Sequence, residues 1–222
     1  MNRKNPCLPA CRRVINKIQE QIRGYIVPVV TEFAKTRDPY LVLISCILSL
    51  RTKDKTTVEA SNRLFKIAGT PGKMLNIPQR RLRELIYPVG FYRIKAKNIS
   101  GINRRLLKDF SGKVPDRLED LLSLKGVGRK TANLVLGLGF GIPAICVDTH
   151  VHRISNRLGW VKTNDPEETE VELSKIIPRK YWIDLNTALV TFGQNICLPV
   201  SPYCSKCSVR QYCLRIGVSR SR

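Results

Sequence analysis

The sequence is poor in acidic residues. It holds only 17 Asp and Glu against 39 Lys and Arg in 222 residues, which gives a formal net charge of +22. A protein with so large an excess of positive charge is expected to bind a polyanion. The shortage of acid therefore leaves two main classes of partner, a nucleic acid and an anionic membrane surface.

A long hydrophobic run is also missing. The longest apolar stretch, Tyr40–Leu50, is too short to span a bilayer and is typical of a buried helix. Met1–Pro6 has no apolar segment behind it, so we expect no secretion signal. A nucleic acid is thus favoured over a membrane, and we expect a monomer in a bacterial or archaeal cytoplasm, associated with the nucleoid.

Strand-like alternation of polar and apolar residues is absent, and so are internal repeats. The chain is therefore predicted to be all-α. Asp38 is suited to cap a helix that has Pro39 at its first position. Residues 217–222 are expected to form a frayed basic tail. Helical spacing of apolar residues predicts helices at about 12–35 (one or two), 40–50, 56–68, 95–110, 149–158, 167–177 and 179–194.

One stretch, Leu121–Arg153, organises the rest. Its segment Lys125-Gly126-Val127-Gly128 is too rich in glycine to continue a helix, and a new helical pattern begins at Arg129. Two helices joined this tightly form a helix-hairpin-helix. The glycines allow close approach to a ligand, and the amides of 127–130 lie at a helix start, where they have no acceptor within the helix.

Such amides, together with the positive end of the helix dipole, can hold a phosphate. The alternative is an ordinary tight turn between two core helices. Arg129, Lys130 and Thr131 follow the turn in a very basic chain, and this favours the phosphate site.

Two residues of the same stretch are candidates for chemistry. Lys130 lies in the first turn of the second helix, where the dipole disfavours a cation, so we expect an amine that can form a Schiff base with a sugar aldehyde. Asp148 follows the apolar run 142–147 and precedes a helical pattern. It is a good N-cap, and a cap at a cleft can still offer one carboxylate oxygen to a substrate.

The eight cysteines fall into two groups. Cys7, Cys11, Cys46 and Cys146 are scattered, and we expect buried free thiols. The others follow the pattern Cys197-x6-Cys204-x2-Cys207-x5-Cys213, which is more typical of a metal site than of disulfides. Four thiolates in one loop can hold zinc or a [4Fe–4S] cluster, and the spacing alone favours neither.

Taken together, these motifs resemble a known family. Gly126-Val127-Gly128-Arg129-Lys130 is followed, eighteen positions after the lysine, by Asp148 within Val147–Arg153. This pattern closely resembles the helix-hairpin-helix, Gly/Pro-Asp superfamily of DNA glycosylases, and within it the endonuclease III family. The likeness extends from about Asp38 to Cys213, and the cysteine spacing also matches.

The resemblance implies two helical domains with an active cleft between them. One is a six-helix barrel at 32–142; the other joins 1–31 to 143–222 and carries a [4Fe–4S] cluster in the loop 197–213. The implied cluster is mainly structural. The implied activity is a bifunctional glycosylase and lyase on double-stranded DNA with damaged bases or abasic sites, preferring oxidised pyrimidines. Lys130 would be the nucleophile, and Asp148 would assist it.

The resemblance also assigns DNA contacts. The hairpin residues Gly126, Val127, Gly128, Arg129 and Thr131 would bind phosphate. Phe91 stands at the position of an apolar wedge, although it also fits a helix core. Arg51 replaces a glutamine that fills the hole left by the flipped base. The loop 198–203 contains no Lys or Arg, whereas in relatives it is basic, so Lys206, Arg210 or the tail is expected to compensate.

Two other hypotheses remain. A monofunctional mismatch glycosylase has the same fold and lacks an amine at the position of Lys130, so this lysine favours the bifunctional class. A non-catalytic DNA-binding module would use the hairpin and the charge alone. His150 and His152, the only histidines, are interpreted as residues of the helix surface or of the DNA-facing side.

Overall fold

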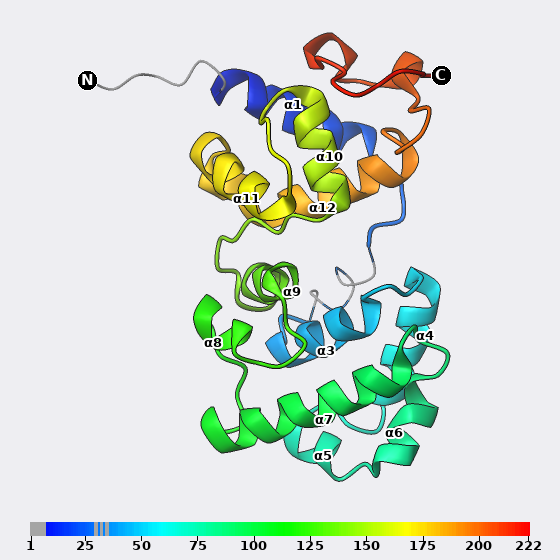
Figure 1. Cartoon of the computed structure of the whole chain (residues 1–222), viewed down its shortest axis with the longest axis vertical. Coiled ribbons are helices and arrows are strands. Elements are labelled where there is room, and N and C mark those ends of the chain that lie inside the picture. Colours follow the sequence, from blue (N-terminus) through cyan, green and yellow to red (C-terminus); the bar gives the residue numbers. More distant parts are fainter. Residues whose placement is uncertain (1–7, 29–30, 32, 34–35) are drawn as a thin grey trace, which may run out of the picture. The chain divides into compact units, whose positions relative to one another are not determined.

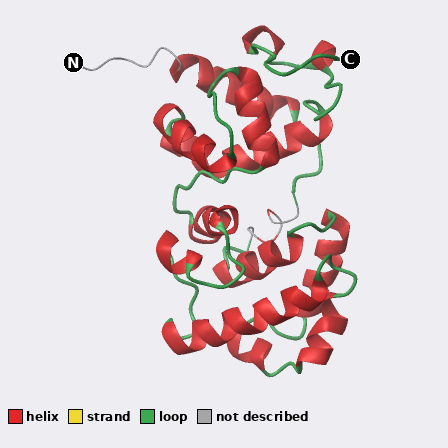
Figure 2. Ribbon diagram, in the orientation of Figure 1, coloured by secondary structure: helices red, strands yellow, loops and turns green. Residues whose placement is uncertain are grey.

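The computed structural model describes residues 8–28, 31, 33 and 36–222. Within these ranges the chain consists of helices and loops and contains no strand (Figure 2). The prediction of an all-α protein is confirmed. Among the described helices, none combines the length and the apolar character needed to cross a membrane.

The chain divides into two compact units, each with its own core (Figure 1). The central unit is Pro28–Ile142. The terminal unit joins Met1–Val27 to Pro143–Arg222. The candidate hairpin therefore belongs to the central unit, whereas Asp148 and the cysteine cluster belong to the terminal unit.

The central unit is built around an apolar helix, α3, and a long helix, α7. The helix α3 packs against α4, α7 and α9, and α7 also packs against α5 and α6. Its described helices are α3 (Pro39–Ser49), α4 (Asp54–Phe65), α5 (Pro71–Leu75), α6 (Gln79–Ile86), α7 (Tyr92–Asp109), α8 (Leu118–Leu122), α9 (Arg129–Leu134) and a π-helical turn, η1 (Val135–Gly139).

The start of α3 is set by the sequence at Asp38 and Pro39. One carboxylate oxygen of Asp38 accepts hydrogen bonds from the amides of Tyr40 (2.8 Å) and Leu41 (3.3 Å), and Pro39 occupies the first helical position. The predicted cap is confirmed. Eight of the 11 residues of α3 are buried, as expected for a helix that is apolar on every side. The turn that follows α3 is therefore anchored in the core.

The hairpin is present, but its second helix is shorter than the sequence suggests. After α8, the chain turns through 123–128 and enters α9, which passes into the π-turn η1 after six residues. A Cβ atom on Gly139 would lie 2.9 Å from the Cα of Pro39, so this glycine lets η1 press against the first turn of α3. The apolar spacing of 129–139 does not distinguish an α-helix from such a widened turn.

The terminal unit gathers its core around α12. The helix α12 packs against α1 and α10, and α10 also packs against α11. Gly159, at φ +76°, ends α10 in the left-handed conformation that glycine adopts most easily. The described helices of this unit are α1 (Leu8–Gln21), α10 (Thr149–Leu158), α11 (Pro166–Ile176), α12 (Trp182–Asn195) and three short 3-10 turns, η2 (Arg179–Tyr181), η3 (Cys204–Lys206) and η4 (Arg210–Tyr212).

The tail 217–222 is not frayed, in contrast to the prediction from sequence. The amide of Arg222 donates to the carbonyl of Pro202, and the amide of Ser205 donates to the carbonyl of Arg222, each at 2.8 Å. The Arg222 guanidinium also lies 4.1 Å from the centre of the Tyr203 ring. Backbone groups of the cluster loop and an aromatic ring hold this segment. These partners lie far from the tail in the sequence, so a local sequence pattern does not predict the contacts.

The scattered cysteines also follow the prediction where they can be assessed. Cys11, Cys46 and Cys146 are buried, and none of them belongs to a disulfide. Cys7 lies outside the described residues. The predicted helical region 12–35 is interrupted after α1, and part of its second half, at 29–30, 32 and 34–35, also lies outside the described residues.

Candidate active site and metal centre

The two glycines of the hairpin turn have different roles. Gly126 adopts φ +91°, and a Cβ atom there would lie 2.6 Å from the side-chain nitrogen of Asn98 on α7. Gly126 is therefore required by the fold itself. Gly128 has an ordinary φ of −96°, and a Cβ atom there would meet nothing within 4 Å. The space in front of Gly128 is open to an external ligand.

The amides of the turn differ from the expectation at one position. Val127 is buried, and its amide donates to the carbonyl of Leu124 at 3.0 Å, so this N–H is already used within the turn. The inference that the Val127 amide is available was wrong, because the turn closes on itself one residue before the helix begins. The amide of Gly128, by contrast, donates to no backbone acceptor in the described part of the chain.

Thr131 is only 2% exposed. Its side chain packs inside the central unit, and any contact that it makes with DNA must come from its backbone. Arg129 is half-buried, and Lys130 is exposed at the first turn of α9. Gly128 and Lys130 are thus the exposed residues at the start of α9.

Lys130 has two titratable neighbours that the sequence analysis missed. Burial raises the pKa of Asp54, the first residue of α4, and the positive charge of Lys130 opposes that rise. Burial likewise raises the pKa of the Cys46 thiol to about 12, again against the charge of Lys130. An acidic residue at a helix start is too common to have marked Asp54 in the sequence.

Asp148 is the N-cap of α10, as predicted. One of its carboxylate oxygens accepts hydrogen bonds from the amides of His150 (2.9 Å) and Val151 (3.0 Å). The residue is half-buried and extended, with φ −118° and ψ −173°. The cap fixes the carboxylate at the end of a helix, where the dipole stabilises its negative charge.

Arg153 connects α10 to the cysteine loop. Its guanidinium donates to the carbonyls of Cys197 (2.9 Å) and Gly193 (3.3 Å) and lies 3.2 Å from the Nδ1 of His150. Burial lowers the pKa of Arg153, while the nearby Cys197 and Asp148 raise it. The same element thus carries Asp148 and holds the first cysteine of the cluster.

His152 lies 2.7 Å from the hydroxyl of Thr169, so both histidines serve contacts within this unit.

Arg51 and Phe91 lie side by side in the central unit. Both side chains are exposed, and Phe91 is 56% exposed. The Arg51 guanidinium lies 5.7 Å from the centre of the Phe91 ring. Both residues have a positive φ, of 52° and 56°, which is uncommon outside glycine and costs energy. The fold thus holds two exposed side chains together in backbone conformations that they would not adopt alone.

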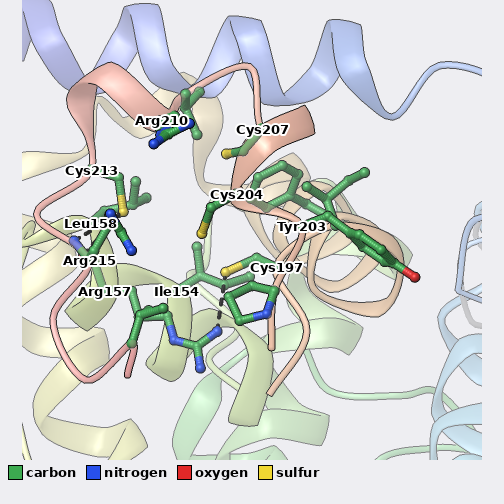
Figure 3. Close-up of a pocket in the computed structure, with 15 residues that line it drawn as sticks. Ile154, Arg157, Leu158, Cys197, Tyr203, Cys204, Cys207, Arg210, Cys213 and Arg215 are labelled. Carbon is green, nitrogen blue, oxygen red and sulfur yellow. Dashed lines mark hydrogen bonds between the residues drawn. The ribbon is translucent and has the colours of Figure 1, made fainter. Parts of the chain in front are cut away.

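The four clustered cysteines line one pocket of the terminal unit. Figure 3 shows the sulfur atoms of Cys197, Cys204, Cys207 and Cys213 around a shared space. Apolar groups from α10 and α12 form the floor of this pocket, among them Ile154, Leu158 and Phe192. A pocket with a dry floor and four sulfur donors suits a metal centre.

The electrostatics of this pocket favour a positively charged occupant. Burial, together with the charges of the other three cysteines, raises the pKa of Cys207 to about 11, against a backbone hydrogen bond at Val209 that lowers it. Four thiolates therefore repel one another here unless a metal neutralises them. The Arg157 guanidinium, 3.4 Å from the sulfur of Cys197, supplies one charged donor to this sulfur. As the side chains stand, no three His, Cys, Asp or Glu of the described residues converge on a position for a single metal ion, so the four cysteines share the pocket without surrounding one ion.

Comparison with known proteins identifies the family. Residues 44–179 match the model of the HhH-GPD superfamily, described as base excision DNA repair proteins. The chain belongs to this superfamily. Within it, the chain is 51% identical over 179 residues to the endonuclease III of Thermotoga maritima, covering 81% of this chain and 84% of that protein.

Two further comparisons extend this result. The chain is 45% identical over 183 residues to the chloroplastic endonuclease III homolog 2 of Arabidopsis thaliana, which covers 78% of this chain but only 47% of that protein. The chain therefore spans about half the length of the plant relative. A solved structure described as a trapped endonuclease III–DNA covalent intermediate has a TM-score of 0.81 and 32% identity, covering 92% of this chain and 94% of that one.

The candidate residues fall into two sets, one in each unit. The central unit brings together the hairpin turn with Lys130 and, separately, Arg51 with Phe91. In the terminal unit, Arg153 links the helix of Asp148 to the cysteine loop.

Proposed function

We propose that this chain is a bifunctional DNA glycosylase and AP lyase of base excision repair, acting on oxidised pyrimidines in duplex DNA. The observation that carries the proposal is Lys130 itself, a lysine in the first turn of α9, directly after the hairpin turn, in a chain of the endonuclease III family. A monofunctional glycosylase needs no amine at this place. The net charge of +22 supports a polyanionic substrate.

Substrate binding would begin with the DNA backbone. The open face of Gly128 and the start of α9 would hold a phosphate, without reading the base sequence. The damaged nucleotide must leave the stack, because the sugar C1′ cannot be reached inside the duplex. Phe91 would insert beside the gap, and Arg51 would fill it and face the unpaired partner base.

The chemistry would then pass through a covalent bond to Lys130. Its Nζ attacks C1′ while the bond between C1′ and the base breaks, and the base leaves with the bonding electrons. The carboxylate of Asp148 stabilises the positive charge that develops on the sugar and takes up the proton lost by Lys130. The C1′–O4′ bond then breaks as O4′ takes up a proton, which opens the sugar ring and leaves an imine between Lys130 and C1′. The imine acidifies the C2′ proton; a base removes this proton, and the bond from C3′ to the oxygen of the 3′ phosphate breaks with the phosphate leaving as an anion. Water finally releases the lysine.

Four thiolates at this spacing and in this pocket fit a [4Fe–4S] cluster, held by Cys197, Cys204, Cys207 and Cys213. When bound, the cluster would cross-link the loop 197–213 and support the terminal unit. The residues around it do the positioning: Arg157 donates to the carbonyls of Leu198 and Pro199, each at 2.7 Å, and so shapes the loop. The reaction itself takes place on Lys130 and Asp148.

We also propose the domain assignment that follows from the family. The central unit corresponds to the six-helix barrel expected at 32–142, and the terminal unit corresponds to the cluster domain expected at 1–31 and 143–222. We further propose that the enzyme acts as a monomer on the nucleoid, in the cytoplasm of a bacterium or archaeon.

The test is an incision assay on a duplex with one thymine glycol or one abasic site. Wild type should release the base and leave a 3′ unsaturated aldehyde, and borohydride should trap a covalent adduct. Lys130→Ala should abolish the adduct and the cut, while keeping salt-dependent DNA binding. Base release without an adduct would favour the mismatch-glycosylase class. Binding without either product would favour a binding module.

The cofactor is tested separately by analysis of the purified chain. We expect about four iron and four sulfide per chain and a brown protein. One zinc per chain, in protein purified anaerobically from iron-rich medium, would contradict the cluster and support the zinc alternative.

A further inference from the structure

A buried lysine, Lys95, forms hydrogen bonds with the turn that carries Arg51. Lys95 is a residue of α7 and is only 5% exposed. Its ammonium donates hydrogen bonds to the carbonyls of Leu48 (2.8 Å) and Leu50 (2.5 Å) and to the hydroxyl of Thr52 (3.0 Å). All three acceptors lie at the end of α3 or in the turn that follows it.

These contacts solve a problem of the α3 terminus. The last carbonyls of a helix have no donor within the helix, and the end of the helix dipole carries negative charge. Lys95, which belongs to another helix, donates hydrogen bonds to these carbonyls and places a positive charge at the negative end of the dipole. A buried ammonium is costly unless all its protons are bonded, and the three acceptors match its three donors.

The same turn is locked to the segment before α7. The amide of Gly90 donates to the hydroxyl of Thr52 at 3.1 Å. A Cβ atom on Gly90 would lie 2.5 Å from the carbonyl oxygen of Arg51, so the two backbones touch where only glycine fits. Thr52 thus accepts from Gly90, the neighbour of Phe91, and from Lys95, one turn further along α7.

We propose that Lys95 is a positioning residue: through Thr52 and the end of α3 it keeps Arg51 and Phe91 together as one preformed pair that acts on the DNA duplex. The strained backbones of the two residues are the features that such a brace maintains. Neither Lys95 nor Thr52 needs to touch the substrate. Burial lowers the pKa of Lys95 to about 8, which agrees with an ammonium enclosed by protein.

This inference rests on the proposed function, since it assumes that Arg51 and Phe91 enter the space left by an extruded nucleotide. A substrate without a partner strand has no such space. The brace should therefore matter for an abasic site in duplex DNA and should not matter for an abasic site in a single-stranded oligonucleotide. A loss of the fold or of Lys130 chemistry would affect both substrates.

The experiment compares the single-turnover rate of borohydride-trapped imine formation on these two substrates, using the full cluster-loaded chain. Lys95→Met removes the ammonium and keeps most of the side-chain length. Its rate on the duplex should fall by about 10- to 100-fold, as expected for a small misplacement of a positioning group. Its rate on the single strand should stay within about two-fold of wild type.

Two further variants complete the test. Lys97→Met removes the same charge from an exposed position on the same helix, and it should behave as wild type on both substrates. Thr52→Val keeps the shape of the side chain and removes the shared acceptor, so it should repeat the duplex-specific loss to a smaller degree. If Lys95→Met does not fold, Thr52→Val decides the question.

The outcomes separate the two claims. If wild type traps on neither substrate, the proposed function fails. If wild type traps on both, and Lys95→Met or Thr52→Val matches it on the duplex, the positioning role is overturned while the function stands. A loss of equal size on both substrates would also overturn the positioning role, because it would indicate a general structural defect.

Discussion

At the scale of single residues, the hairpin motif contains two glycines, Gly126 and Gly128, that are glycine for different physical reasons. Gly126 is required by its positive φ and by Asn98, whereas nothing inside the protein requires Gly128 to be small. A sequence motif alone presents the two glycines as equivalent. Only the packing shows that one of them supports the turn and that the other faces outward.

Substitution of each glycine by alanine separates these roles. Gly126→Ala should lower the unfolding free energy by about 2 kcal/mol, because an L-residue is strained at this φ and its Cβ meets Asn98. Gly128→Ala should leave stability unchanged and weaken binding to duplex DNA, because its methyl group would cover the phosphate site. Urea unfolding and DNA titration measure the two effects. Equal stability of both variants would contradict the account of Gly126.

Lys95 gives a pH dependence with a definite sign. Its pKa is lowered to about 8 from an ordinary 10.5 by burial, so between these values the unfolded chain holds a proton that the folded chain has lost. The contribution of Lys95 to the unfolding free energy therefore rises with pH in this window. The difference between wild type and Lys95→Met, measured by urea unfolding, should increase from pH 8 to 10.5. A difference that stays constant over this pH range would argue against a lowered pKa of Lys95 in the folded chain.

Lys95 also shows what the sequence could and could not reveal. It stands four, seven and eleven positions before Ile99, Ile102 and Leu106, which are all buried on α7, so a lysine occupies the first position of a buried, mainly apolar stripe. This is a local signal of a buried cation. The acceptors, however, lie 43 to 47 positions earlier in the chain, and no local pattern points to them.

At the scale of elements, the helix α10 combines a structural and a proposed catalytic role in Asp148. The start of α10 was predictable, because aspartate before a helical pattern is a strong N-cap. The hydrogen bonds from the amides of His150 and Val151 to Asp148 are both present. The π-turn after α9 was not predictable, since its close packing on Pro39 depends on a residue about a hundred positions away. Local chemistry thus set the helix starts, whereas tertiary contacts set how they continue.

The two roles of Asp148 can be separated by substitution. Asp148→Asn retains an oxygen that accepts from the amides of His150 and Val151, so the thermal stability should stay close to that of wild type. Its rate of base release should fall at least about 100-fold, because the negative charge is lost. Asp148→Ala should lose the same activity and about 1 kcal/mol of stability as well. Calorimetry and single-turnover kinetics distinguish the two variants. An active Asp148→Asn would contradict the catalytic role.

At the scale of the whole molecule, the chain separates its tasks between two units. The central unit contains the hairpin with Lys130 and the pair of Arg51 and Phe91. The terminal unit contains Asp148, which caps α10, and the cysteine pocket. The all-α class was predictable because apolar residues follow helical spacing throughout. The docking of Arg222 on the cluster loop was not predictable, because it depends on backbone groups of another segment.

Loss of the cluster should therefore affect one unit more than the other. Cys204→Ala should speed amide hydrogen exchange in α10, α12 and the loop 197–213, because these elements surround the cysteine pocket. Exchange in α3 and α7 should stay close to that of wild type, because their core belongs to the central unit. Exchange mass spectrometry measures both sets of peptides. A uniform increase over the whole chain would contradict this division.

The proposed mechanism depends above all on the covalent bond between Lys130 and the sugar. The most direct measurement is to trap wild type on an abasic duplex with borohydride, digest the adduct and locate the modified residue by mass spectrometry. We expect a single modified peptide with the sugar remnant on Lys130 Nζ. An adduct on another lysine, or no adduct from cluster-loaded protein that binds the duplex, would contradict it.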